Sequence, residues 1–168
     1  QNFMNDKQVV QGCCGLLNHC EVLADDTQMN VLTTVLTVFA TYSKDAPINL
    51  ACAKLLLTLC LSENATSKML HLEVYNALNM ENLRILYRTA TDYSKDAFIL
   101  TLMANLLELL APVSASDLVT TGFVSILLLG VRSSGDRPCI IACCHALAAL
   151  AISPECLYIL SQQCCSSD

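Results

Sequence analysis

Cysteine is the residue type in this chain best suited to chemistry, because a thiolate can bind soft metals and act as a nucleophile. The 11 cysteines are Cys13, Cys14, Cys20, Cys52, Cys60, Cys139, Cys143, Cys144, Cys156, Cys164 and Cys165. None of them form the C-x-x-C spacing typical of zinc and redox sites, and three pairs are direct neighbours in the sequence. Neighbours on a helix diverge by about 100°, so such pairs do not face one tetrahedral ion. We expect buried free thiols, no metal and no cofactor.

Catalytic motifs are absent from the sequence. It contains no G-x-G-x-x-G or G-x-x-x-x-G-K loop for phosphates, no H-E-x-x-H zinc motif and no G-x-S-x-G nucleophile motif. Cys144 and His145 have the residue types of a nucleophile and its base, but as neighbours on one helix they point in different directions. We therefore predict that the chain is not an enzyme.

Polar side chains that interrupt apolar segments are the remaining candidates for a binding site. We predict that these residues contact a protein partner: Lys54, Asn105, His145, Asn18, His19 and Glu108. The alternative is that they form only the solvated stripe that a surface helix carries.

A repeated pattern indicates which elements position these residues. The segment Tyr42–Ala46 recurs as Tyr93–Ala97, and its register extends to two further copies. The four copies begin near Asp6, Asp45, Asp96 and Asp136. Internal repeats of this length are typical of stacked helical units.

Three columns of equivalent positions contain mainly apolar residues. Within each copy the three positions are spaced as i, i+8 and i+11, so they lie on one face of its helix. The apolar columns are Val9, Ile48, Ile99, Cys139; Leu17, Leu56, Leu107, Leu147; and Cys20, Leu59, Leu110, Leu150. A column of small residues is Cys14, Ala53, Ala104, Cys144, and beside it lies the sulfur-rich column Cys13, Cys52, Met103, Cys143. We expect these columns to be buried and each leading Asp to cap the first turn of its helix. Lys54, Asn105 and His145 share another column, which predicts a polar line along one wall.

The segments between these helices also have helical patterns. We predict second helices at 27–42, 79–91 and 116–131, with an additional short helix at 64–78. Residues 33–38 have the composition of a strand, but their flanks and repeat position favour a helix. The predicted fold class is therefore all-α.

The best copy, Asp136 to Ala151, resembles the inner helix of armadillo and HEAT repeats. This resemblance implies a right-handed α-solenoid, a single armadillo/HEAT-like domain over residues 1–168, which we expect to be part of a longer protein. Armadillo proteins that grip extended basic peptides resemble one another in ladders of Trp and Asn. Here the Trp ladder is replaced by Gly15, Lys54, Asn105 and His145. The resemblance therefore implies a helical or folded protein partner rather than an extended peptide.

Composition narrows the function further. The chain has 168 residues, of which 54% are hydrophobic and 14% charged, with a formal net charge of −6. Scattered basic residues in an acidic chain predict no nucleic-acid partner, and the absence of a long uninterrupted apolar run predicts no membrane span. The odd number of cysteines, with no signal-peptide pattern in the sequence, favours an intracellular location, cytoplasmic or nuclear.

Our main functional prediction is a non-catalytic protein-interaction scaffold. One alternative is a homo-oligomerisation module, such as a homodimer, in which two copies pair through the apolar end segment Pro154 to Leu160. The other is a zinc-binding or redox-responsive protein that uses cysteine and histidine, for example Cys139, Cys143 and His145.

Overall fold

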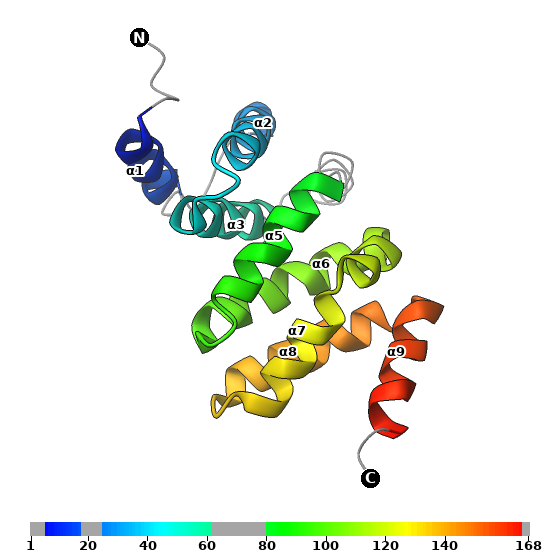
Figure 1. Ribbon diagram of the computed structural model, residues 1–168. Coiled ribbons are helices and arrows are strands. Elements are labelled where there is room, and N and C mark those ends of the chain that lie inside the picture. Colours follow the sequence, from blue (N-terminus) through cyan, green and yellow to red (C-terminus); the bar gives the residue numbers. More distant parts are fainter. Residues whose placement is uncertain (1–5, 18–24, 62–79, 166–168) are drawn as a thin grey trace. The chain divides into compact units, whose positions relative to one another are not determined.

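The computed structural model describes residues 6–17, 25–61 and 80–165 and confirms the all-α prediction: in these ranges it contains eight helices and no strand (Figure 1). The chain divides into two compact units, Gln1–Thr89 and Ala90–Asp168. The boundary lies within helix α5 (Met80–Asp92).

The four aspartates that lead the repeat copies all cap helices, as the sequence predicts. Helices α1 (Lys7–Leu17), α3 (Ala46–Leu61), α6 (Ala97–Thr121) and α8 (Arg137–Leu150) each begin directly after one of them. The carboxylate of Asp96 accepts hydrogen bonds from the backbone N–H groups of Phe98 and Ile99. The other three bind the equivalent third backbone N–H, at 3.0–3.3 Å. These contacts satisfy donors that have no partner within the first turn of the helix.

The first unit is built around α3, which packs against both α1 and α2 (Asp25–Thr41). Its fully buried side chains include Phe39 from α2, Leu55 and Leu56 from α3, and Leu86 from α5. Residues 33–38 lie within α2, which confirms that the β-rich segment is helical. Packing therefore overrides local strand propensity.

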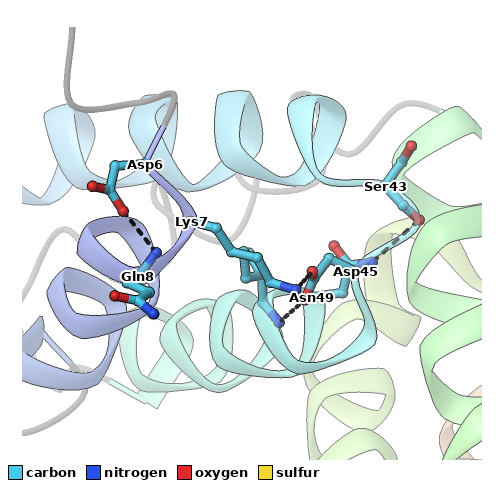
Figure 2. A network of polar contacts seen from close by, with 7 residues as sticks. Asp6, Lys7, Gln8, Ser43, Asp45 and Asn49 are labelled. Atoms are coloured by element: carbon cyan, nitrogen blue, oxygen red, sulfur yellow. Dashed lines mark hydrogen bonds and ion pairs between the residues drawn. The ribbon is translucent and has the colours of Figure 1, made fainter.

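Polar contacts join the beginnings of α1 and α3 (Figure 2). The ammonium group of Lys7 forms an ion pair with the carboxylate of Asp45. This hydrogen-bonded pair lowers the pKa of Asp45. The side-chain amide of Asn49 donates to the carbonyl of Ser43 at 3.2 Å, and the guanidinium of Arg88 donates to the same carbonyl at 3.4 Å. These bonds hold the turn that precedes α3.

The second unit is centred on α6 and α8, which pack closely together, while α7 (Phe123–Ser133) lies against both of them. Gly130 permits this approach: a Cβ there would lie 2.7 Å from Leu100 Cδ2 and 2.8 Å from Cys143 Sγ. Helix α9 (Pro154–Cys165) packs on α6 and buries Cys156.

Of the predicted second helices, 27–42 and 79–91 are confirmed to within two residues by α2 and α5. The continuous helix predicted at 116–131 is wrong. The chain breaks at Gly122, whose φ of 106° suits glycine, so residues 116–121 end α6 and a new helix, α7, follows. Within α6 itself, Ser114 is non-helical two residues after Pro112. The helix predicted at 64–78 lies outside the described residues.

Helix α6 is long and apolar enough, by length and composition, to cross a membrane. Half of the most apolar 18-residue stretch of α6 is buried within the structure. The core helix of a soluble protein has the same length and composition. In the sequence, Asn105 and Glu108 interrupt this apolar run. The absence of a membrane span remains a prediction.

The three apolar columns are buried in the second, third and fourth copies, where the last contributes Cys139, Leu147 and Leu150. In α3 and α6 the equivalent residues Ile48 and Ile99, Leu56 and Leu107, and Leu59 and Leu110 are all buried. The first copy departs from the prediction at Val9, which is exposed. Its Leu17 and Cys20 side chains lie outside the described residues.

Candidate functional site

Three of the predicted site residues lie on the two packed helices of the second unit. Asn105 and Glu108 are one turn apart on α6, and His145 lies on α8. His145 Nδ1 is 3.9 Å from Glu108 Oε2, and the two side chains are 63% and 42% exposed. They form an ion pair when the imidazole is protonated. Because both groups are solvated, the pair contributes little to stability and stays accessible to a partner.

Two large exposed apolar side chains lie on the same two helices. Ile141 lies one turn before His145 on α8 and is 45% exposed, and Phe98, two turns before Asn105 on α6, is 69% exposed. We call this set of five residues the α6–α8 face: Phe98, Asn105, Glu108, Ile141 and His145. Phe98 and Ile141 are not among the residues predicted from the sequence, because apolar residues of the repeat helices are expected in the core. The helical spacing of Ile141 and His145 is the signal that could have identified the former.

The other predicted site residues, Lys54, Asn18 and His19, belong to the first unit. Lys54 is half-buried on α3 in the first unit, and its backbone carbonyl accepts a hydrogen bond from the Thr58 hydroxyl. The extension of the polar line to Lys54 therefore stays a prediction. Asn18 and His19 lie outside the described residues.

Most of the described thiols are buried, with two exceptions. Cys14, Cys52, Cys139, Cys143 and Cys156 are buried free thiols, as predicted. The prediction of burial is wrong for Cys13 and Cys144, which are exposed. Their repeat-equivalent residues in α3 and α6, Cys52 and Met103 for Cys13 and Ala53 and Ala104 for Cys144, are buried.

The suggested zinc ligands do not converge. Cys139 and Cys143 are buried in α8, whereas His145 is exposed on the same helix. Within the described ranges, no group of three or more Cys, His, Asp or Glu side chains is arranged to hold a metal ion. Cys144 and His145 are both exposed on α8, so the structure adds no reason to view them as a catalytic pair.

A pocket of about 280 Å³ lies beside the beginning of α6 and the end of α7. It is lined by Ser94, Lys95, Ala97, Leu100, Leu129, Ser133 and Ser134. Two of these hydroxyls already take part in local bonds: Ser133 donates to the Leu129 carbonyl, and Ser134 accepts from the Asp136 N–H. Lys95 is the one ionisable residue in this lining, so the pocket offers no acid–base pair.

Comparisons of the chain with protein-family models, curated proteins and solved structures gave no significant match.

Proposed function

We propose that this protein is a non-catalytic protein-interaction scaffold, built as an armadillo- or HEAT-like solenoid, whose α6–α8 face binds a helical segment of a partner protein. The observation that carries the proposal is the exposure of Ile141 one turn from His145, and of Phe98 two turns before Asn105, on the two packed helices that form the Glu108–His145 pair. Exposed apolar side chains next to charged groups are typical of interaction surfaces. The free thiols fit a partner in the cytoplasm or nucleus, where thiols stay reduced.

Burial of the two cysteine-containing columns supports a stack of repeats. The first copy exposes Cys13 and buries Cys14, whereas the last copy buries Cys143 and exposes Cys144. In the middle copies both columns are buried, as Cys52 and Ala53 in α3 illustrate. In a solenoid, the inner helix of a middle repeat packs against both the preceding and the following repeat. The inner helix of the first or last repeat packs against one neighbour, so one of its sides stays exposed.

The helices of the second unit support an armadillo-type repeat. Between the kink at Ser114 and the beginning of α8, the chain forms the short helical segment 115–121, the turn at Gly122, and α7. Together with α8 this makes three consecutive helices, the number in an armadillo repeat, whereas a HEAT repeat has two. The alternative of a two-helix unit is therefore less favoured here.

Charge indicates the chemistry of the partner. The chain has a formal net charge of −6, and Glu108 places a carboxylate on the proposed face. Opposite charges accelerate association and select partners. The fitting partner is a helix that presents apolar side chains to Phe98 and Ile141 and a basic side chain to Glu108.

Site-specific photocrosslinking tests this proposal directly. A photoreactive amino acid replaces Asn105 or His145, and the control replaces Ser125, an exposed residue of α7 in the same unit. We expect one protein to be crosslinked in cells at both test positions and not at Ser125, and its crosslinked peptide to be helical and basic. Equal labelling at all three positions, or no protein crosslinked at the test positions, would contradict the proposal.

Self-association is a second candidate, favoured by α9. Leu157 and Tyr158 are exposed on this helix, and Ile152 is exposed just before it. A second copy of the chain could cover these side chains. Analytical ultracentrifugation of wild type and Leu157→Glu distinguishes the cases: a dimer that the substitution dissociates supports self-association, and a wild-type monomer over the accessible concentrations excludes it.

A further inference from the structure

Two thiols meet where α1 packs on α3 in the first unit. Cys14 lies in α1 and Cys52 in α3, with exposed fractions of 5% and 0%, and the two side chains are hydrogen-bonded to each other. The neighbouring Cys13 points to the exposed side of the helix. We propose that Cys14 and Cys52 form a peroxide-sensitive redox site, whose reversible disulfide ties α1 to α3.

The contact gives the two thiols different chemical roles. The hydrogen bond from Cys52 stabilises the Cys14 thiolate and lowers the pKa of Cys14 to about 7. The same contact, together with burial, raises the pKa of Cys52. A thiol with a pKa near ambient pH is the better nucleophile, and a neighbouring thiol that stays protonated can resolve its oxidised form. Cys14 is thus the attacking residue and Cys52 the resolving residue.

The reaction balances with hydrogen peroxide as the oxidant. The Cys14 thiolate attacks one peroxide oxygen: an S–O bond forms, the O–O bond breaks, and the leaving hydroxide takes up the proton released by Cys14 to become water. The sulfur of Cys52 then loses its proton and attacks the sulfur of the Cys14 sulfenic acid. The S–S bond forms, the S–O bond breaks, and the leaving hydroxide takes the proton of Cys52 as a second water. Two thiols are oxidised and one peroxide is reduced.

Helix α1 can open to admit the peroxide. It has 11 residues, and Gly12 and Gly15 flank its cysteine pair with no packed atom within 4 Å of an added Cβ. A short helix with interior glycines has low intrinsic stability, so local opening requires little free energy. The Lys7–Asp45 ion pair holds the beginning of α1 on α3, which favours return of Cys14 to the same partner thiol.

A second thiol pair provides an internal control. Cys139 and Cys143 lie one turn apart, both buried in α8. Burial, together with the proximity of Cys139, raises the pKa of Cys143 to about 12. Cys143 therefore stays protonated and unreactive near neutral pH, and burial keeps Cys139 away from a dissolved oxidant.

The first experiment uses the wild-type protein, reduced and then treated with hydrogen peroxide, alkylated, digested and analysed by mass spectrometry. We expect two peptides joined through Cys14 and Cys52, with a mass two hydrogen atoms below the sum of the two reduced peptides. Dithiothreitol should separate them. Cys139 and Cys143 should stay reduced during peroxide treatment and therefore be alkylated afterwards. Hydrogen exchange in α1 should slow in the oxidised protein. A Cys14 that stays reduced while Cys13 and Cys144 are oxidised, or that pairs with another cysteine, would overturn the proposal.

Substitutions separate the two roles. In Cys52→Ser the oxidation of Cys14 should stop at the sulfenic acid, which dimedone labels, because the resolving thiol is missing. The matched control, Cys139→Ser, removes a buried thiol elsewhere and should leave the Cys14–Cys52 disulfide intact. If peroxide produced as much dimedone adduct at Cys14 in the wild type as in Cys52→Ser, Cys52 would not be the resolving residue. The wild-type peptide map decides the proposal even if Cys52→Ser does not fold.

Discussion

The first and last repeat helices, α1 and α8, begin in the same way and pack differently. Each follows an aspartate that caps its first turn, and each carries a Cys-Cys pair at the same register position. In α1 the second cysteine of the pair is buried, whereas in α8 the first is buried. The register thus determines where a helix starts and which residues share a face, but the neighbouring helices determine which face is covered.

Glycine shows the same contrast. Gly12 and Gly15 in α1 have open space where a side chain would lie, whereas Gly130 in α7 lies against Leu100 and Cys143 of the second unit. The glycines of α1 weaken a loosely packed helix, and the glycine of α7 permits close packing. We therefore expect substitutions in α1 to affect stability less than equivalent substitutions in the packed helices of the second unit.

The largest expected effect is in the core of α8. Leu147→Ala removes a buried side chain and should lower the free energy of unfolding by about 2–5 kcal/mol. Its matched control is Leu16→Ala in α1, where the side chain is 73% exposed and the cost should be within about 0.5 kcal/mol. Urea denaturation measures both. Similar losses for the two variants would show that α1 is packed as tightly as α8.

Gly→Ala substitutions should have opposite signs in the two regions. Gly130→Ala places a Cβ within 3 Å of two buried side chains, so overpacking should destabilise the protein by about 1–3 kcal/mol. Gly12→Ala meets no neighbour and should stabilise α1 by about 0.5–1 kcal/mol through its helix propensity. Thermal denaturation and hydrogen exchange in α1 check the two signs. A stabilising Gly130→Ala would contradict the close approach of α7.

The capping aspartates should differ in the extent of the structure that they stabilise. Asp136→Ala removes the N-cap of a packed helix and should lower the global free energy of unfolding by about 0.5–2 kcal/mol. Asp6→Ala removes the equivalent cap of α1 and should mainly accelerate hydrogen exchange within that helix, because α1 opens locally. If Asp6→Ala lowered global stability as much as Asp136→Ala, α1 would be part of the cooperative core.

The smallest effect concerns pH. The pKa of Asp45 is lower in the folded protein because Lys7 stabilises its carboxylate. This contribution is present above the pKa of about 4 of an unfolded aspartate and is lost as pH falls through the lower, folded value. Lys7→Met should therefore lower stability by up to about 1 kcal/mol at pH 6, and the difference from wild type should vanish at strongly acidic pH. A difference that grows on acidification would contradict this assignment.

The sequence predicted the fold well where local physics decides. The four capping aspartates, the helical nature of residues 33–38 and the burial of columns such as Leu56 and Leu107 all follow from side-chain chemistry and helical spacing. The break at Gly122 was missed because its flanks continue an apolar helical pattern. A single glycine in such a pattern is compatible with both a helix interior and a left-handed cap.

The candidate site was only partly predictable. Asn105, Glu108 and His145 stood out because polar residues interrupted apolar helices, and the structure brings Glu108 and His145 together. The exposure of Phe98 and Ile141 and the meeting of Cys14 with Cys52 depend on which helices pack together. Tertiary neighbours of this kind are not encoded in the spacing of residues along one helix.

The most direct test of the central claim is the affinity of the purified protein for the partner crosslinked at the α6–α8 face, measured by isothermal titration calorimetry. Glu108→Lys reverses the charge on this face, and Ser125→Lys introduces the same residue on the exposed side of α7. We expect Glu108→Lys to weaken binding at least about tenfold, equivalent to about 1.4 kcal/mol, and Ser125→Lys to bind like the wild type. Equal dissociation constants for wild type and both variants would contradict the claim that this face binds the partner.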